Sequence, residues 1–460
     1  MNNTDPRETI MNSPMSTMQI VAVAITIGLN ALDGFDVMSI SYASPEILRE
    51  WGITRSTLGF VLSAELVGMA LGSILIGGVA DKFGRRATML GCLLVMSLGM
   101  FLATTATGVV SLSIWRVITG LGIGGMLAAI NAVAAEFANA KRKHMCVSLM
   151  AIGYPVGAVV GGTIAAQLLA IYEGWRPIFV FGGIVTAAFI PLVYFFIPES
   201  IHWLARKQPP GALERINATL KRMGHAAIST LPRISEEVRK RSATDLFAPG
   251  LIAVTLLVTL AYFFHITTFY YIIKWVPEIV TRMGFESSQA AGVLVWVNAG
   301  GATGGAVLGF LTLRFPLKAL TIGVLALSTV MVTIFGSSPD DLARLSMICF
   351  AAGFCTNAGI VGLYAIFAHA FPTHVRASGT GFAIGVGRGG AVIAPIIAGF
   401  LFDAEFSRPT VSLIMGLGSL LGAGMLLLLK LRPEGPSAEE VEDESSRERE
   451  PSAQLGRSPA

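Results

Sequence analysis

The stretch KFGRRA at residues 82–87 recurs in degenerate form as RFPLKA at residues 314–319, which is 232 positions further along the chain. The same offset places PEI at residues 45–47 on PEI at residues 277–279. Matched glycines and alanines extend this correspondence along the chain without a gap. A constant offset over such a length indicates an internal duplication. We therefore expect two halves that are built on one plan and have the same orientation.

The composition is that of a chain that lies in a membrane. Of the 460 residues, 53% are hydrophobic and 13% are charged, and the mean hydropathy is +0.68. Soluble proteins carry about 25% charged residues, and about 20 apolar residues suffice to span a bilayer. We count twelve such runs, near residues 19–43, 57–79, 87–107, 109–135, 145–170, 177–197, 250–273, 289–312, 319–336, 343–368, 378–402 and 410–430. The predicted fold class is an all-α membrane protein with twelve transmembrane helices in two pseudo-symmetric six-helix bundles.

A long hydrophilic break divides the twelve runs into two sets of six. The predicted organisation is an N-terminus at 1–18, a first bundle at 19–198, a linker at 199–248, a second bundle at 249–432 and a tail at 433–460. Within the linker, apolar residues recur at helical spacing from Leu213 to Met223, which predicts a short amphipathic helix on the membrane face. The tail is rich in Pro, Ser, Glu and Arg, a composition typical of disorder.

Basic residues concentrate in the loops on one side of the predicted membrane. The loops after the second, fourth, eighth and tenth runs hold Lys82, Arg85, Arg86, Lys141, Arg142, Lys143, Arg314, Lys318 and Arg376. Since Lys and Arg favour the cytoplasmic side, both termini are predicted to be cytoplasmic, in a multi-pass protein of a bacterial inner membrane. The four cysteines form no CxxC pair. We expect no metal, no cofactor and no nucleic-acid partner.

The first apolar run carries two acids, Asp33 and Asp36, within the stretch ALDGFD at residues 31–36. Their spacing places both on one helix face, together with Asn30. An ionised carboxylate at membrane depth costs at least about 2.5 kcal/mol. If the first helix ended early, both acids would lie among headgroups. Because residues 37–43 continue without a charge, we favour acids that face a water-filled path and carry protons or bind a solute.

The duplication gives the two acids different counterparts. Asp33 aligns with His265, and Asp36 aligns with Thr268. His265 is either a satisfied packing histidine or a proton-sensitive group, because the pKa of histidine is tunable across physiological pH. The aromatic run that follows it includes Tyr270, which either packs or stacks on an aromatic solute. Further candidates as polar liners of a cavity are Asn298 and Asn357.

Two arginines lie inside apolar runs. Arg116 stands near the outer end of the fourth run, where it either extends to the headgroups or faces the cavity as a counter-ion. Arg388 lies about ten residues into the eleventh run, with no headgroup in easy reach. A guanidinium binds a carboxylate bidentately, so Arg388 is the preferred anion-binding residue. Glu136 and Glu65 lie nearer the ends of their runs, and Glu136 is either a headgroup-level residue or an exit carboxylate in a proton path.

The loop GGVADKFGRR at residues 77–86 resembles the signature loop of the major facilitator superfamily. In it Gly77 would allow close helix approach, while Asp81 could accept a hydrogen bond from an arginine or a helix N-terminus and so latch one conformation. Arg85 and Arg86 either join this latch or hold the loop at the cytoplasmic side. The second copy of the loop has Leu313 in place of the acid, so we expect the latch to be asymmetric.

The DGxD element at residues 33–36, the loop at residues 77–86 and the RxxxGxGxG element from Arg116 together resemble the aromatic acid:proton symporter family of that superfamily. The resemblance covers roughly residues 18–430. It implies a carrier with a small aromatic acid anion and protons as its partners. We also expect a monomer in membrane lipid, and not an enzyme, because the sequence shows no nucleophile-base constellation and no metal-ligand spacing. Carried over by motif, the resemblance points to Asp33, Asp36, Asp81, Arg85, Arg86 and Arg116. From their depth and polarity we add Glu136 to the two aspartates as a proton-coupling candidate. On the same grounds we name Arg388, Arg116, His265, Asn298 and Tyr270 as the solute-binding candidates.

Two alternative functions remain at the level of sequence. The glycine-proline stretch GYPVG at residues 153–157 loosely resembles an element of proton-coupled exporters of drugs or metabolites. A receptor that binds aromatic acids without transporting them is a further alternative, although neither the linker nor the tail offers a signalling domain.

Overall fold

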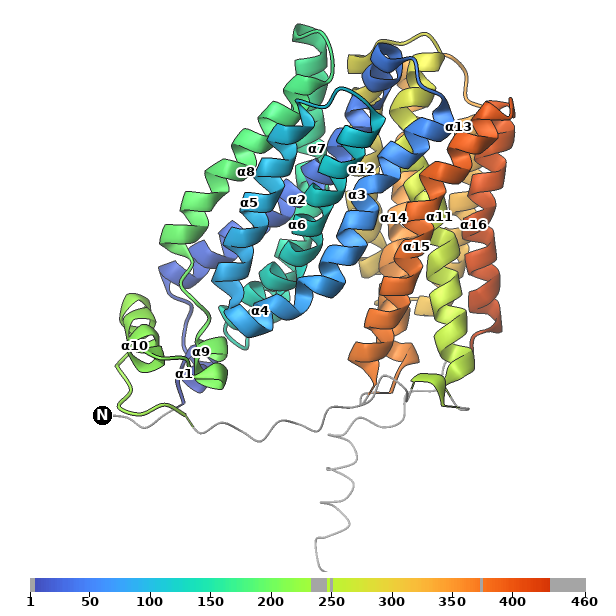
Figure 1. Cartoon of the computed structure of the whole chain (residues 1–460). Coiled ribbons are helices and arrows are strands. Elements are labelled where there is room, and N and C mark those ends of the chain that lie inside the picture. Colours follow the sequence, from blue (N-terminus) through green and yellow to red (C-terminus); the bar gives the residue numbers. More distant parts are fainter. Residues whose placement is uncertain (1–4, 233–245, 249–250, 373–374, 431–460) are drawn as a thin grey trace, which may run out of the picture.

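The structure, a computed structural model, describes residues 5–232, 246–248, 251–372 and 375–430. These residues form helices and loops, and no β-strand occurs among them. Twelve of the helices are long and apolar enough to cross a membrane. They form two six-helix bundles (Figure 1), which confirms the predicted fold class. The predicted tail at 433–460 and the middle of the predicted linker, 233–245, lie outside the described residues.

The first bundle is built from α2 to α8, in which the short α4 continues the course of α3. The bounds are α2 Thr17–Trp51, α3 Arg55–Leu75, α4 Gly77–Phe83, α5 Arg85–Ala103, α6 Val109–Glu136, α7 Lys143–Ile171 and α8 Arg176–Phe196.

The second bundle follows the linker and repeats the order of the first. Its helices are α11 Ile252–Arg282, α12 Ser287–Leu311, α13 Leu317–Gly336, α14 Leu342–Ala370, α15 Arg376–Asp403 and α16 Arg408–Leu428. Three short helices lie outside the bundles: α1 Pro6–Asn12, α9 Ile201–Lys207 and α10 Ala212–Met223. The helix α10 is the amphipathic helix that the linker sequence predicted, with Ile216, Leu220 and Met223 on its buried side.

The two bundles approach each other at one end and diverge toward the other, where α4, α9 and α10 lie (Figure 1). We call the diverging end the α4 end and the joined end the opposite end. At the opposite end the side chain of Arg55 forms an ion pair with Glu278, at 2.9 Å between Nε and Oε1. The Asp403 carboxylate accepts from the backbone N–H groups of Arg55 and Ser56 at 3.0 and 2.8 Å. These contacts join α3 of the first bundle to the second bundle.

The duplication is visible in how the helices pack. A Cβ at Gly68 of α3 would lie 2.1 Å from the carbonyl oxygen of Val117 on α6. A Cβ at the equivalent Gly300 of α12 would lie 1.9 Å from the carbonyl oxygen of Phe350 on α14. Both positions therefore admit only glycine, because two backbones meet there. Small residues that permit close helix approach are typical of membrane bundles.

The outer surface of the bundles is apolar. Large side chains such as Ile74 and Phe310 are 75% and 66% exposed. Soluble monomers rarely expose apolar surface over a wide area, so these side chains face lipid. The chain is a multi-pass membrane protein, and the charged residues that it buries require a separate explanation.

Candidate functional site

The middle of α2 carries the two predicted acids. This helix runs unbroken to Trp51, so the acids do not lie at an early helix end, as one reading of the sequence allowed. The exposed fraction is 2% for Asp33 and 0% for Asp36. Within the described part of the chain, none of their four carboxylate oxygens has a hydrogen-bond partner. Buried polar groups are normally paired, and an unpaired buried carboxylate indicates a functional site.

Arg116 lies beside the two acids but binds neither carboxylate. Its guanidinium forms an ion pair with Glu65 of α3, and both side chains are fully buried. It also donates to the backbone carbonyl of Asp36 at 2.8 Å and lies over the ring of Phe179, 5.2 Å from the ring centroid. With an exposed fraction of 0%, Arg116 does not extend to the headgroups. Of the two readings of the sequence, the structure favours a counter-ion inside the bundle.

Lys274 brings the second bundle into the same group of charges. It lies on α11, is fully buried, and its ammonium donates to the carbonyl oxygen of Val37 on α2 at 2.6 Å. The same nitrogen lies 4.0 Å from the second carboxylate oxygen of Glu65. Lys274 was not singled out from the sequence because the predicted seventh run ended at residue 273, whereas α11 continues to Arg282 and includes this lysine.

These five residues form what we call the charge cluster: Asp33, Asp36, Glu65, Arg116 and Lys274. Their charges act on one another directly, since Asp33 interacts with Asp36 and Glu65, and Lys274 with Glu65 and Arg116. Three carboxylates face two cations, so the cluster carries a formal charge of −1 when all five groups are ionised. One bound proton makes it neutral. A cluster of this composition can hold a proton at membrane depth.

Arg388 stands apart from the charge cluster, on α15 of the second bundle. Its side chain is partly buried and makes no hydrogen bond or ion pair with the residues that the structure describes. Its charge acts on the phenol groups of Tyr154 and Tyr270. Both phenols also interact with Glu65. Tyr154 and Tyr270 therefore lie within the electrostatic influence of both Arg388 and Glu65.

Three other predicted solute-binding or cavity-lining residues are engaged within the second bundle. The ring nitrogens of His265 lie 2.8 Å from the hydroxyl of Ser419 and 2.8 Å from the carbonyl oxygen of Thr356. Asn298 donates to a carbonyl of its own helix at 2.9 Å, and Asn357 donates to the carbonyl of Gly301 at 2.6 Å. This geometry favours the packing interpretation of His265.

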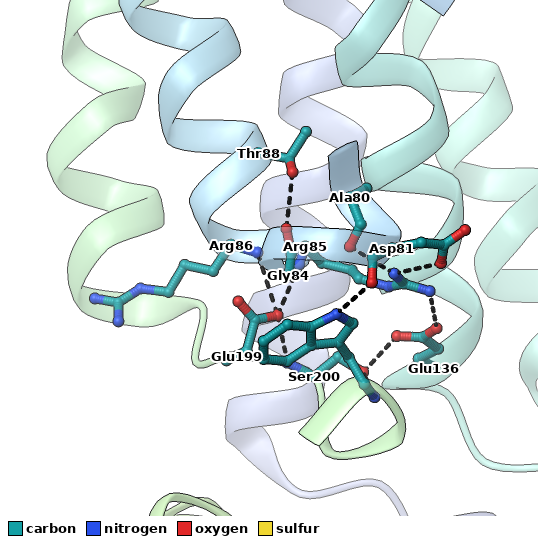
Figure 2. A network of polar contacts seen from close by, with 10 residues as sticks. Ala80, Asp81, Gly84, Arg85, Arg86, Thr88, Glu136, Glu199 and Ser200 are labelled. Carbon is teal, nitrogen blue, oxygen red and sulfur yellow. Dashed lines mark hydrogen bonds and ion pairs between the residues drawn. The ribbon is translucent and has the colours of Figure 1, made fainter. Parts of the chain in front are cut away.

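The predicted latch lies at the α4 end (Figure 2). Arg85 donates to Asp81 at 2.8 Å and forms an ion pair with Glu136 at 3.2 Å. The arginine partner of Asp81 thus lies four residues further along the chain, within the same loop region. Glu136 also accepts a hydrogen bond from Ser200, so it belongs to this network and lies outside the charge cluster.

The segment that follows α8 covers this loop (Figure 2). Glu199 accepts from the backbone N–H of Arg85 at 2.8 Å, and the indole of Trp203 donates to the carbonyl of Asp81 at 2.9 Å. Arg86 lies over the ring of Tyr194, 4.8 Å from its centroid. Gly77 is the first residue of α4. The network links the first bundle to the start of the linker.

Two six-helix bundles with buried charges between them form the architecture of secondary transporters. Residues 26–351 match the family model described as Major Facilitator Superfamily, and the chain belongs to this family.

The chain is similar to two transporters from Pseudomonas putida. A gallate transporter is 28% identical over 427 residues, which cover 92% of this chain and 94% of that protein. The 4-hydroxybenzoate transporter PcaK is 29% identical over 396 residues, which cover 85% and 87%. These relatives confirm the resemblance to aromatic acid transporters that the motifs indicated.

A solved structure shows the same fold. A bacterial homologue of the human lysosomal transporter Spinster, in an inward-facing and unoccupied conformation, has a TM-score of 0.71 at 14% identity, covering 90% of this chain and 97% of that one. At this identity the likeness is one of fold alone.

Proposed function

We propose that this protein is a secondary transporter that imports an aromatic carboxylate with protons by alternating access. The observation that carries the proposal is the pair of buried carboxylates, Asp33 and Asp36, which have no hydrogen-bond partner among the described residues. Burying an unpaired ionised carboxylate is costly. Protonation removes that cost, so these two acids are suited to take up and release protons during transport.

The substrate class follows from the second bundle and from the relatives. Arg388 presents a guanidinium that no described side chain occupies, and guanidinium binds carboxylates in a bidentate way. Tyr154 and Tyr270, whose phenol groups experience the charge of Arg388, provide aromatic rings for stacking. The similar proteins are named as transporters of gallate and 4-hydroxybenzoate, which are aromatic acids. We place the carboxylate of the substrate on Arg388 and its ring near the two tyrosines.

The charge balance sets the energetics. The membrane potential provides about 2.3 kcal/mol per charge per 100 mV. One proton that travels with one monoanion is electroneutral and responds only to the pH gradient, whereas a second proton would draw on the potential. The formal charge of −1 on the charge cluster requires at least one proton for neutrality.

The arrangement of the bundles fits an inward-facing conformation. If both termini and the α4 end are cytoplasmic, as the basic loops favour, the bundles are joined on the outside and apart on the inside (Figure 1). The outward-facing conformation then requires the contacts of Arg55 with Glu278 and of Asp403 with α3 to break. We place the protein in a bacterial inner membrane, as a monomer with the domain boundaries that the sequence predicted.

Uptake by purified protein in liposomes tests the proposal. Labelled 4-hydroxybenzoate and a panel of competing aromatic acids are added outside, with the exterior more acidic than the lumen. We expect accumulation that a protonophore abolishes. Uptake that survives the protonophore at the same rate would contradict proton coupling. Transport that instead needs the reverse gradient would favour the proton-coupled exporter.

Substitution of Arg388 tests the substrate site. Arg388→Gln should raise the KM for the aromatic acid by about tenfold or more, because a charge-assisted hydrogen bond to the carboxylate is lost. Arg344→Gln is the matched control, since Arg344 is exposed near the start of α14. Equal KM values in the two variants would remove Arg388 from the site.

A further inference from the structure

Lys274 is the one member of the charge cluster that the second bundle supplies. We propose that Lys274 is the counter-ion through which the second bundle completes the charge balance of the carboxylates on the first, with Glu65 as its partner. The role in transport rests on the proposed function, whereas the pairing itself does not. Lys274 would act through Glu65, and is therefore a positioning residue.

Two neighbouring backbone carbonyls of α2 carry the geometric argument. Arg116 of the first bundle donates to the carbonyl of Asp36 at 2.8 Å, and Lys274 of the second bundle donates to the carbonyl of Val37 at 2.6 Å. Each cation also faces one carboxylate oxygen of Glu65. Glu65 thus faces two cations. Arg116 belongs to the same bundle as Glu65, and Lys274 belongs to the opposite bundle.

Complete burial makes this contact consequential. The side chains of Glu65, Arg116 and Lys274 all have an exposed fraction of 0%. Charges interact more strongly in a buried site than in water, and an isolated buried charge is strongly disfavoured. Opening the end opposite α4 moves α11 away from α2 and α3, and so removes Lys274 from both of its oxygen partners. That step therefore depends on the charge that Glu65 carries.

The position also shows why a purely structural lysine is a poor explanation. An apolar residue of similar length would fill the same volume without the cost of burying a charge. The equivalent position in the first bundle is Tyr42, an uncharged residue whose hydroxyl donates to the carbonyl of Ala158 at 2.9 Å inside its own bundle. Lys274 instead reaches across to the other bundle.

A double-mutant cycle on stability tests the pairing without reference to transport. The variants are Lys274→Gln, Glu65→Gln and the double variant, and the readout is the apparent Tm of the purified full-length protein. We expect the double variant to be more stable than the sum of the single effects requires, by about 2 °C or more. Additive shifts would overturn the proposal whatever the protein transports.

Uptake by the same variants tests the role in transport. Lys274→Gln leaves three carboxylates facing one cation, and we expect initial uptake of the aromatic acid to fall by about tenfold or more. Removing one carboxylate in Lys274→Gln/Glu65→Gln restores the formal charge of −1 and should recover most of that loss. A double variant as inactive as the single one, at equal amount and Tm, would contradict the counter-ion role.

Tyr271→Phe is the matched control. Tyr271 is fully buried on the same helix and bonds to the hydroxyl of Ser412 at 2.7 Å within the second bundle. Its loss should lower the Tm without a rescue by Glu65→Gln. If the wild-type protein transports no aromatic acid but the stability cycle is non-additive, the proposed function fails and the pairing stands.

Discussion

The helices α2 and α11 occupy equivalent places in the two bundles and treat their polar residues in opposite ways. On α2, Asp33 and Asp36 are buried carboxylates without a hydrogen-bond partner in the described structure. On α11, the equivalent His265 is held on both ring nitrogens, and the equivalent Thr268 donates to a backbone carbonyl at 2.6 Å. The duplication has kept the position of these side chains and changed their chemistry. At these equivalent positions, buried carboxylates without any hydrogen-bond partner occur on α2 and not on α11.

The same contrast extends to the rest of the site. Glu65 and Arg116 of the first bundle align with an uncharged valine and isoleucine in the second. Lys274 and Arg388 of the second bundle align with a tyrosine and a valine in the first. Neither bundle therefore contains a complete site. The carboxylates of the charge cluster all lie on the first bundle, and Lys274 and Arg388 are supplied by the second, a distribution that fits the solute site we propose between the two bundles.

The largest effect should come from removing the carboxylates of α2. Asp33→Asn and Asp36→Asn take away the groups that we expect to bind protons, so accumulation driven by a pH gradient should fall to background in the double variant. The matched changes on α11, His265→Asn and Thr268→Val, should lower stability but leave the dependence on the pH gradient intact. Labelled aromatic acid uptake in liposomes measures both.

This prediction has a clear opposite outcome. If the α11 variants lost gradient dependence while the α2 variants retained it, proton coupling would lie in the second bundle. Protein amount and apparent Tm must be matched before the rates are compared, since the α11 variants break buried hydrogen bonds. Comparing each single aspartate variant with the double one would show which carboxylate is the coupling group.

The next largest effect concerns helix packing, which differs between the two bundles at one pair of equivalent glycines. A Cβ at Gly157 of α7 would lie 1.7 Å from the carbonyl oxygen of Ala31 on α2, whereas one at the equivalent Gly389 of α15 would lie 3.4 Å from the ring of Phe263. Gly157→Ala should therefore cost about 3 kcal/mol through overpacking against backbone, while Gly389→Ala should be nearly neutral. Thermal unfolding of the two purified variants compares them, and similar Tm values would show that α2 and α7 can separate freely.

The sequence predicted the fold well for two reasons. Hydropathy indicates which segments lie within the membrane, and helical spacing indicates which side chains share one face of a helix. The twelve runs became twelve helices, and one offset of 232 residues anticipated the matched packing of Gly68 and Gly300. The spacing of Asp33 and Asp36 predicted that they share one helix face, and the structure buries both side chains. Each of these features depends on the residue pattern within one helix or on the similarity between the two halves of the sequence.

The partners of the buried charges could not be predicted in this way. The sequence left open whether Arg116 reaches the headgroups or acts as a counter-ion, and the structure pairs it with Glu65. It also left open whether His265 packs or titrates, and the structure holds both of its ring nitrogens inside its bundle. Lys274 was missed altogether. Which residue of a neighbouring helix faces a given side chain depends on how helices rotate and cross when they pack, and the pattern within a single helix does not contain that information.

A smaller loss of stability is expected at two equivalent contacts that join one bundle to the other. Arg55 bonds to Glu278, and the equivalent contact joins Ser287 to Glu46 at 2.6 Å. The first contact is an ion pair and the second is a hydrogen bond to a hydroxyl. Arg55→Ala should cost about 2 kcal/mol and Ser287→Ala about 1 kcal/mol, because bonds between charged groups are stronger. Denaturation in detergent tests the ranking, which would be reversed if Glu46 were the more important glutamate.

The smallest effect should appear at the α4 end, where α9 covers the loop of the first bundle. Burial lowers the pKa of His202 below its ordinary value of 6.5. The charge of Glu136 opposes this shift, and the charges of Arg7 and Lys143 add to it. Folding therefore favours the neutral imidazole. Its contribution to stability is complete above pH 6.5 and is lost as the pH falls from 6.5 toward the lowered pKa of the folded protein.

The pH dependence of unfolding can isolate this contribution. Between pH 7 and pH 5 the apparent Tm of the wild-type protein should fall more than that of His202→Gln, by at most about 2 °C. The carboxyl of Asp5, whose pKa is lowered mainly by its hydrogen bond to Arg7, loses its contribution only below its ordinary value of 3.8 and does not interfere in this range. A wild-type Tm that rose on acidification would mean that the acids around His202, Glu136 and Asp5, outweigh its burial. In that case the contact between α9 and the loop at residues 77–86 would become more stable as the pH falls.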